Sequence, residues 1–237
     1  MLSTVLTGKV NISKNYKLPS FNDLYWYPMG NKNLKSENGW SYQGGFQYTF
    51  SRKRWLTKFE TMGFYNHIFD MIVWKPQTAT YWSPVNIGKV KTYGNILDCS
   101  FVYRHKIWFV RIDADYTYTE TKNDDEDDIN YGNELIYVPK NKANINIFFS
   151  YGSFLIKYTQ QMTSSVFCTS DNESVLKGYM ITNIGLSKTL NTYRNKLSIN
   201  IYSGINNLFN KIYQVMASRP MPLRYFKFGF ILKFNNY

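Results

Sequence analysis

The sequence predicts an all-β protein whose antiparallel strands form part of a transmembrane β-barrel. Three observations predict this fold: aromatic residues abound in a polar chain, apolar and polar residues alternate, and long and short connections alternate along the chain. A membrane-spanning strand has one face toward lipid and one toward a polar lumen, so both kinds of residue recur with a period of two. The 237 residues suffice for one such domain.

The amino-acid composition fits the sheet of a membrane barrel better than the packed core of a globular protein. Aromatic residues make up 19% of the chain, with 21 Tyr, 17 Phe and 6 Trp, although the mean hydropathy is −0.39. Such a mixture is typical of a sheet with one apolar face and rings of aromatic side chains at each membrane interface. The chain has no run of about 18 apolar residues, so no transmembrane helix is predicted.

The last segment shows the alternation most clearly. Apolar residues occupy every second position of this segment, and we call them a row: Phe226, Phe228, Phe230, Leu232 and Phe234. Successive residues of a strand point to opposite faces of its sheet, so this row predicts an apolar face. Similar rows run over 42–50, 93–103, 110–118, 143–149 and 197–201.

Connection lengths separate a membrane barrel from a soluble sandwich. Outer-membrane barrels have short periplasmic turns and long extracellular loops, whereas a sandwich has no reason to sort its loops in this way. The predicted strands cover 4–14, 38–50, 55–70, 88–104, 106–119, 138–149, 153–163, 178–189, 196–206 and 223–234. Long connections are predicted at 15–37, 71–87, 120–137, 164–177 and 207–222, and short ones at 51–54, 105, 150–152 and 190–195.

The net charge of +12 raises the question of a nucleic-acid partner. The basic residues gather in the short turns, at 52–54, 104–106 and 194–196, while the acidic run 124–128 falls in a long loop. Cations scattered over turn tips do not form a groove for a phosphate backbone, so no nucleic-acid partner is expected. The acidic run lacks the ligand spacing of a calcium loop and is interpreted as a solvated tip.

No pattern indicates an enzyme or a cofactor. His67 and His105 are the only histidines and lie far apart, and no nucleophile, zinc, phosphate-loop or dinucleotide motif is present. Cys99 and Cys168 are interpreted as two separate thiols rather than a disulfide. Residues 1–5 do not form a signal peptide, so we expect either an upstream start or a truncated gene.

Residues 16–37 resemble the paired loop motif of TonB-dependent outer-membrane receptors. The stretch 19–25, PSFNDLY, is similar to the family's PSFxELY, and 30–37, GNKNLKSE, is similar to GNPxLKPE. Lys17, Lys32 and Ser36 depart from the family's usual Arg, Pro and Pro. The two halves in tandem before an alternating strand make the resemblance fairly specific.

Three further stretches resemble the same family. Residues 65–72 are similar to its YxxxIxDxI strand end, and 84–94 to the segment around NxGxxxxxG that precedes its next strand. The stretch 205–213, INNLFNKIY, is similar to VxNLFNKxY, and 220–224 to xPxPGR, with Leu223 in place of the usual Gly. The resemblance covers essentially residues 1–237, which are interpreted as one partial barrel domain.

The resemblance implies about ten C-terminal strands of a barrel of about 22 strands with a plugged lumen. The plug and the segment through which TonB acts have no counterpart in this chain. The implied location is the Gram-negative outer membrane, with lipid against the barrel and TonB acting only through the missing plug. The row ending at Phe234 resembles the C-terminal signal for the barrel-assembly machinery. Asp113 and Asp115, on one strand face with Arg111, are interpreted as a lumenal charge ladder.

The resemblance also implies uptake of a large, scarce nutrient, with cobalamin or a ferric siderophore first. Two alternatives stay open: a truncated remnant without transport, and a passive porin-type or adhesin-type barrel. Aromatic residues on or beside the first two long connections are candidates for stacking on a ligand, and the competing interpretation is an aromatic girdle or loop packing. These candidates are Tyr25, Trp26, Tyr27, Trp40, Trp74, Tyr81 and Trp82.

Overall fold

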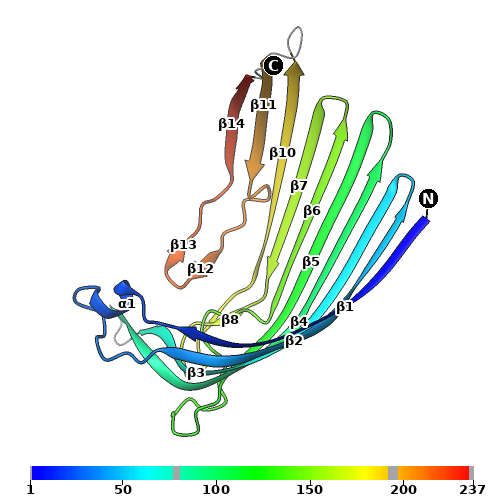
Figure 1. Cartoon of the computed structure of the whole chain (residues 1–237). Helices are drawn as coiled ribbons and strands as arrows, with labels where there is room; N and C mark the ends of the chain where they lie inside the picture. Colours follow the sequence, from blue (N-terminus) through cyan, green and yellow to red (C-terminus); the bar gives the residue numbers. More distant parts are fainter. Residues whose placement is uncertain (1, 77–80, 192–196, 235–237) are drawn as a thin grey trace.

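The computed structural model describes residues 2–76, 81–191 and 197–234. Ten long strands form one curved antiparallel sheet in the order β1-β2-β3-β4-β5-β6-β7-β10-β11-β14 (Figure 1). Each strand pairs with its neighbour along the chain, so the sheet is a simple meander. The strands are β1 (Leu2–Lys17), β2 (Glu37–Arg52), β3 (Trp55–Pro76), β4 (Trp82–Arg104), β5 (Trp108–Asn123), β6 (Asn141–Tyr151), β7 (Phe154–Thr163), β10 (Tyr179–Asn191), β11 (Leu197–Asn206) and β14 (Tyr225–Phe234).

The ten predicted strands are confirmed, but several of their ends differ from the prediction. β3 and β4 continue as a paired hairpin through most of the predicted loop 71–87, with Trp74 opposite Pro84. β5 extends to Asn123, and β6 begins only at Asn141. The predicted turn 190–195 and the start of the predicted strand 196–206 fall partly outside the described residues.

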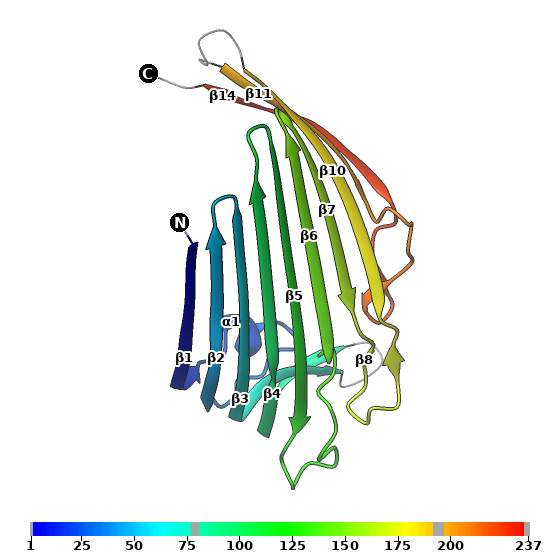
Figure 2. The same ribbon diagram turned by 90° about the vertical axis from the view of Figure 1, so that its right-hand side faces the viewer.

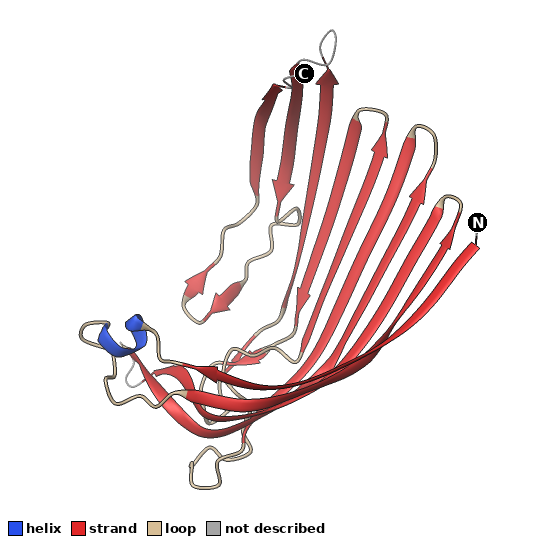
Figure 3. Ribbon diagram, in the orientation of Figure 1, coloured by secondary structure: helices blue, strands red, loops and turns tan. Residues whose placement is uncertain are grey.

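Small elements occupy three of the long connections, and Figure 3 shows how little of the chain is helical. The first contains the only helix of the described ranges, α1 (Phe21–Tyr25). β8 (Val166–Phe167) pairs with β9 (Val175–Leu176), and β12 (Gln214–Met216) with β13 (Arg219–Pro220). No helix in the described ranges is long and apolar enough to cross a membrane.

The register gives the sheet one apolar face along its whole width. Tyr42 of β2 lies opposite Tyr65 of β3, which lies opposite Tyr93 of β4. At the far side of the sheet, Phe226 of β14 lies opposite Ile205, and Phe230 opposite Ile201. Many large apolar side chains on this face are exposed, as on the lipid-facing wall of a barrel.

The other face carries polar and charged side chains. Glu60, Asp98 and Asp115 occupy opposed positions on β3, β4 and β5. The Nζ of Lys9 on β1 lies 2.6 Å from a carboxylate oxygen of Glu60. On β5, Arg111 contacts the carboxylate of Asp113 at 2.6 Å, so the predicted charge ladder is present.

The sheet does not close within the described residues, because β1 and β14 form its two edges. Figure 1 shows the N-terminal and C-terminal strands at opposite margins of the curved sheet. An open edge exposes unpaired backbone groups, which are costly in lipid. A closed wall would therefore need further strands.

Candidate functional site

The candidate site is the end of the sheet from which the long connections leave, here called the loop end (Figure 2). Its components are the segment 18–36 with α1, the outer halves of β3 and β4, and the connections 124–140, 164–178 and 207–224. The opposite end has the short turns and is here called the turn end. Loops placed by a rigid sheet are the usual location of binding residues.

A capping box holds the short helix α1 at the loop end. The hydroxyl of Ser20 accepts a bond from the backbone N–H of Asp23, and the Asp23 carboxylate accepts one of 2.8 Å from the Ser20 N–H. This reciprocal arrangement satisfies two backbone donors that a helix start leaves open. Ser20 and Asp23 belong to the motif stretch 19–25, so that stretch has a structural role.

Asp23 also joins the helix to the β3–β4 hairpin. The indole Nε1 of Trp74 donates a hydrogen bond of 2.9 Å to its carboxylate. Burial alone would raise the pKa of Asp23, but the hydrogen bonds from Ser20 and Trp74 outweigh it and lower the pKa below its ordinary value of 3.8. The carboxylate is therefore a charged, buried anchor.

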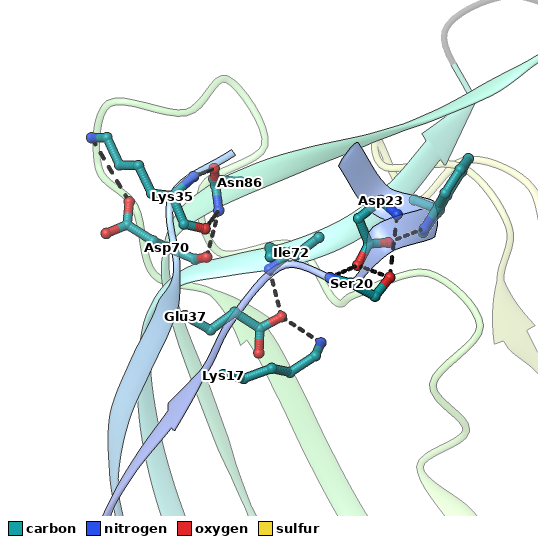
Figure 4. A network of polar contacts seen from close by, with 9 residues as sticks. Lys17, Ser20, Asp23, Lys35, Glu37, Asp70, Ile72 and Asn86 are labelled. Carbon is teal, nitrogen blue, oxygen red and sulfur yellow. Dashed lines mark hydrogen bonds and ion pairs between the residues drawn. The ribbon is translucent and has the colours of Figure 1, made fainter. Parts of the chain in front are cut away.

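Glu37 provides a second anchor, at the start of β2 (Figure 4). Its carboxylate accepts a hydrogen bond of 2.8 Å from the backbone N–H of Ile72, and the Nζ of Lys17 donates to the same oxygen at 2.8 Å. These contacts join β1, β2 and the outer half of β3. Glu37 closes the motif stretch 30–37.

Asn86 provides the third anchor and bonds backbone groups of two segments. Its side-chain amide donates to the carbonyl oxygens of Asp70 and Lys35 at 2.7 and 3.0 Å, and its Oδ1 accepts from the Lys35 N–H at 2.9 Å. Figure 4 shows this cluster beside Glu37. Asp70 has a positive φ of 53°, so the amide stabilises an uncommon backbone conformation.

The predicted aromatic residues divide into three groups. Tyr25, Trp26 and Tyr27 lie together at the end of α1 and are exposed, Tyr27 by 92%. Lys32 places its Nζ 5.6 Å from the centre of the Tyr25 ring. This exposed group is available for stacking on a ligand.

The aromatic residues of the second connection lie on or beside strands. Trp74 is held by Asp23, and the ring of Trp82 packs 5.8 Å from that of Tyr137. Tyr81, directly before β4, is exposed. Trp74 and Trp82 therefore have packing roles, which agrees with the loop-packing interpretation rather than with ligand stacking.

Trp40 lies apart from the other candidates. It stands on β2 in the apolar row with Tyr42, and the two rings stack at 6.3 Å. The register places Trp40 opposite Lys14 and His67, and the Nζ of Lys14 lies 5.9 Å from the indole centre. An indole on the apolar face near a strand end matches the girdle interpretation.

The connection 124–140 packs against the β3–β4 hairpin. Ile87, Val90 and Leu135 form a buried apolar cluster. Beside it is a cavity of about 280 Å³ whose apolar lining includes Met71, Val73 and Leu135. The outer part of the molecule thus has its own small core.

The acidic run 124–128 is less solvated than predicted. Asp124 contacts the Nζ of Lys91 at 2.7 Å, and Asp128 lies 3.7 Å from the Nζ of Lys75. Both carboxylates are mostly shielded, because the run folds back over the strand ends. Within the described ranges, no three His, Cys, Asp or Glu side chains are grouped to hold a metal ion.

The last long connection is held by Asn207. Its N–H donates to Oδ1 of Asn183 at 2.9 Å, and its side chain exchanges two hydrogen bonds with the backbone of Lys211. Asn210 accepts from the Arg224 N–H at 2.9 Å. The motif stretch 205–213 therefore also fixes a loop.

The anchors Asp23, Glu37 and Asn86 were missed as site residues at the sequence level. Each lies inside a stretch that resembles the family, and this motif is the sequence signal that could have identified them. Cys99 and Cys168 are both free, as predicted.

A two-faced antiparallel meander with long connections at one end is the architecture typical of part of a membrane β-barrel. The family model "TonB dependent receptor-like, beta-barrel" matches residues 3–208. The chain belongs to this family of outer-membrane receptors.

Curated relatives are vitamin B12 transporters. The chain is 26% identical over 221 residues to BtuB of Photobacterium profundum, covering 88% of the chain and 33% of that protein. It is 32% identical over 114 residues to BtuB of Vibrio vulnificus, covering 46% of the chain and 17% of that protein. The chain thus spans about a third or less of these relatives.

Solved structures share the fold. The copper transporter OprC matches with a TM-score of 0.69 at 16% identity, over 93% of this chain and 35% of OprC. The ferric yersiniabactin receptor FyuA from Yersinia pestis matches with a TM-score of 0.64 at 18% identity, over 97% of this chain and 35% of FyuA. At these identities the similarity concerns the fold alone.

Proposed function

We propose that the chain forms part of the C-terminal wall of an outer-membrane transporter that imports a large, scarce nutrient with energy delivered by TonB. The observation that carries this proposal is the two-faced sheet with loops docked at one end. In this arrangement the apolar face contacts lipid, the polar face lines the lumen, and the loop end opens to the cell exterior.

We propose cobalamin as the preferred candidate ligand, and a ferric siderophore as the second candidate. The curated vitamin B12 transporters support this order, because one of them aligns with 88% of the chain. The exposed group Tyr25, Trp26 and Tyr27 would contact the ligand from the first loop, with Tyr81 beside it. Trp74 and Trp82 would support these loops, and Trp40 would lie at the membrane interface.

The partners in this proposal belong to a longer protein. The remaining strands would close the barrel at β1 and β14, and a plug domain would fill the lumen and contact TonB. Phe228, Phe230 and Phe234 of β14 would present the aromatic row to the barrel-assembly machinery.

Equilibrium binding to the full-length receptor in detergent tests the proposal. We expect cyanocobalamin to bind, and Tyr25→Ala/Trp26→Ala/Tyr27→Ala to weaken binding by at least about tenfold, because stacked aromatic contacts often dominate a binding site. Tyr151→Ala, at the turn end, is the control and should bind as the unmodified receptor does. The proposed ligand class would be contradicted if the receptor bound an oligosaccharide but neither cobalamin nor a ferric siderophore.

A further inference from the structure

Exposed cations line the turn end. Arg52, Lys53 and Arg54 form the tip between β2 and β3, and Arg104 and Lys106 lie at the tip between β4 and β5. All five are exposed, and together they are here called the basic turn row. Arg194 and Lys196, which are predicted at a short turn, lie outside the described residues.

Backbone hydrogen bonds tie neighbouring turns together. The Arg104 N–H donates to the Arg54 carbonyl at 2.9 Å, which joins the first two tips. The Gly152 N–H donates to the Ile107 carbonyl at 2.7 Å, which joins the second tip to the third. The cations are therefore carried on a fixed rim and not on independent flexible turns.

The basic turn row has no acidic partner in the described part of the chain. None of its five cations takes part in an ion pair there, whereas Lys17, Lys75 and Lys91 at the loop end all do. Residues 49–59 and 99–112 contain no Asp or Glu. The positive charge of this rim is therefore available to an external anion.

An aromatic belt lies directly beside the rim, on the apolar face. The ring of Trp55 lies 4.2 Å from that of Tyr103, which lies 5.0 Å from that of Trp108. Trp108 in turn lies 6.5 Å from Phe149. Tyr and Trp are enriched at membrane–water interfaces, so this belt is expected at the level of the lipid headgroups.

One tip forms a shallow hollow in which both features meet. Phe50, Arg52, Lys53, Arg54 and Trp55 line a volume of about 520 Å³. Three cations and two aromatic rings thus surround one space. A phosphate with an attached apolar chain fits this lining, because its charge can meet the cations while its chain follows the apolar face.

We propose that the basic turn row binds the phosphate groups of anionic glycerophospholipids in the membrane leaflet on the turn-end side. The inference rests on the membrane placement in the proposed function, and it adds a lipid class that the placement alone does not require. A soluble polyanion fits less well, since the cations stand at the margin of an exposed apolar wall.

Lipid selectivity measured by electron spin resonance tests this inference. The full-length receptor is reconstituted in phosphatidylcholine vesicles containing a trace of spin-labelled phosphatidylglycerol or spin-labelled phosphatidylcholine, and the association of each lipid with the protein is compared. We expect a preference for phosphatidylglycerol that Arg52→Gln/Lys53→Gln/Arg54→Gln lowers by about fivefold or more. The matched control is Lys32→Gln/Lys89→Gln/Lys177→Gln, which removes three exposed charges at the loop end and should keep the preference.

Four outcomes would overturn the inference, and they can be told apart. Equal association of the two lipids, or an unchanged preference in the turn variant, overturns the inference alone. If neither lipid associates with the protein, both the inference and the membrane placement in the proposed function are wrong. Loss of the preference in inorganic phosphate but not in sodium chloride of equal ionic strength would identify a site for a soluble anion instead. Heat-modifiable gel migration checks that the variants fold.

Discussion

The indole Nε1 of Trp74 donates a hydrogen bond of 2.9 Å to the carboxylate of Asp23, 51 positions away in the chain. Through this contact the β3–β4 hairpin holds the helix that carries the exposed aromatic residues. Because Asp23 also closes the capping box of α1, one carboxylate fixes both the start of the helix and its place on the sheet.

Replacement of this carboxylate should loosen the first loop without unfolding the sheet. Asp23→Ala leaves the Trp74 indole and the Ser20 N–H without their acceptor, at a cost of about 1–3 kcal/mol in local stability. Hydrogen exchange read by mass spectrometry should accelerate in residues 20–31 and 72–76. Asp127→Ala, which removes an exposed carboxylate from another loop, is the control. Unchanged exchange in Asp23→Ala would show that the anchor is dispensable.

The same anchor should depend on pH. Hydrogen bonds lower the pKa of folded Asp23 below 3.8, so its contribution to docking is complete above that value. The contribution declines as the pH falls through the lower, folded pKa, because the protonated carboxyl is a weaker acceptor. The indole N–H resonance of Trp74, assigned with Trp74→Phe, should therefore shift with a midpoint below pH 3.8. A midpoint at or above this value would contradict the assignment.

Gly94 should tolerate no side chain. A Cβ at this position would overlap the Tyr118 carbonyl oxygen on β5, whereas a Cβ at Gly44 meets no atom within 4 Å. Gly94→Ala should therefore destabilise the sheet by about 2 kcal/mol or more, and Gly44→Ala by less than about 1 kcal/mol. The denaturant midpoint of refolded protein in detergent measures both. Equal midpoints would show that β4 and β5 adjust freely.

The ten long strands could be predicted because apolar and polar residues alternate along a strand that has one apolar and one polar face. The outer ends of β3 and β4, at 71–76 and 82–87, could not be predicted, since Pro76 and Pro84 interrupt the pattern there. The helix α1 has five residues, too few to show a helical period, although Ser20 and Asp23 have the spacing of a capping box.

The candidate site was predictable only in part. Aromatic residues were chosen by their position in long connections, and this choice identified the exposed group around Trp26. It did not distinguish Trp74, because the partner that holds its indole is distant in sequence and no local pattern reports such a contact. The structural role of Asn86 is hidden for the same reason: its three hydrogen bonds reach Lys35 and Asp70.

The central claim, that this sheet is a membrane wall with one face in lipid, is tested most directly by scanning β6. Spin labels are attached to single cysteines at 143–149 in a full-length receptor whose other cysteines, including Cys99 and Cys168, are replaced by Ser, and this receptor is reconstituted in bilayers. Ala143, Ile145, Ile147 and Phe149 should be accessible to oxygen dissolved in lipid, and Asn144, Asn146 and Phe148 to a water-soluble nickel chelate. Alternation with a period of two is the predicted result. Accessibility of both sets to the chelate would contradict the account.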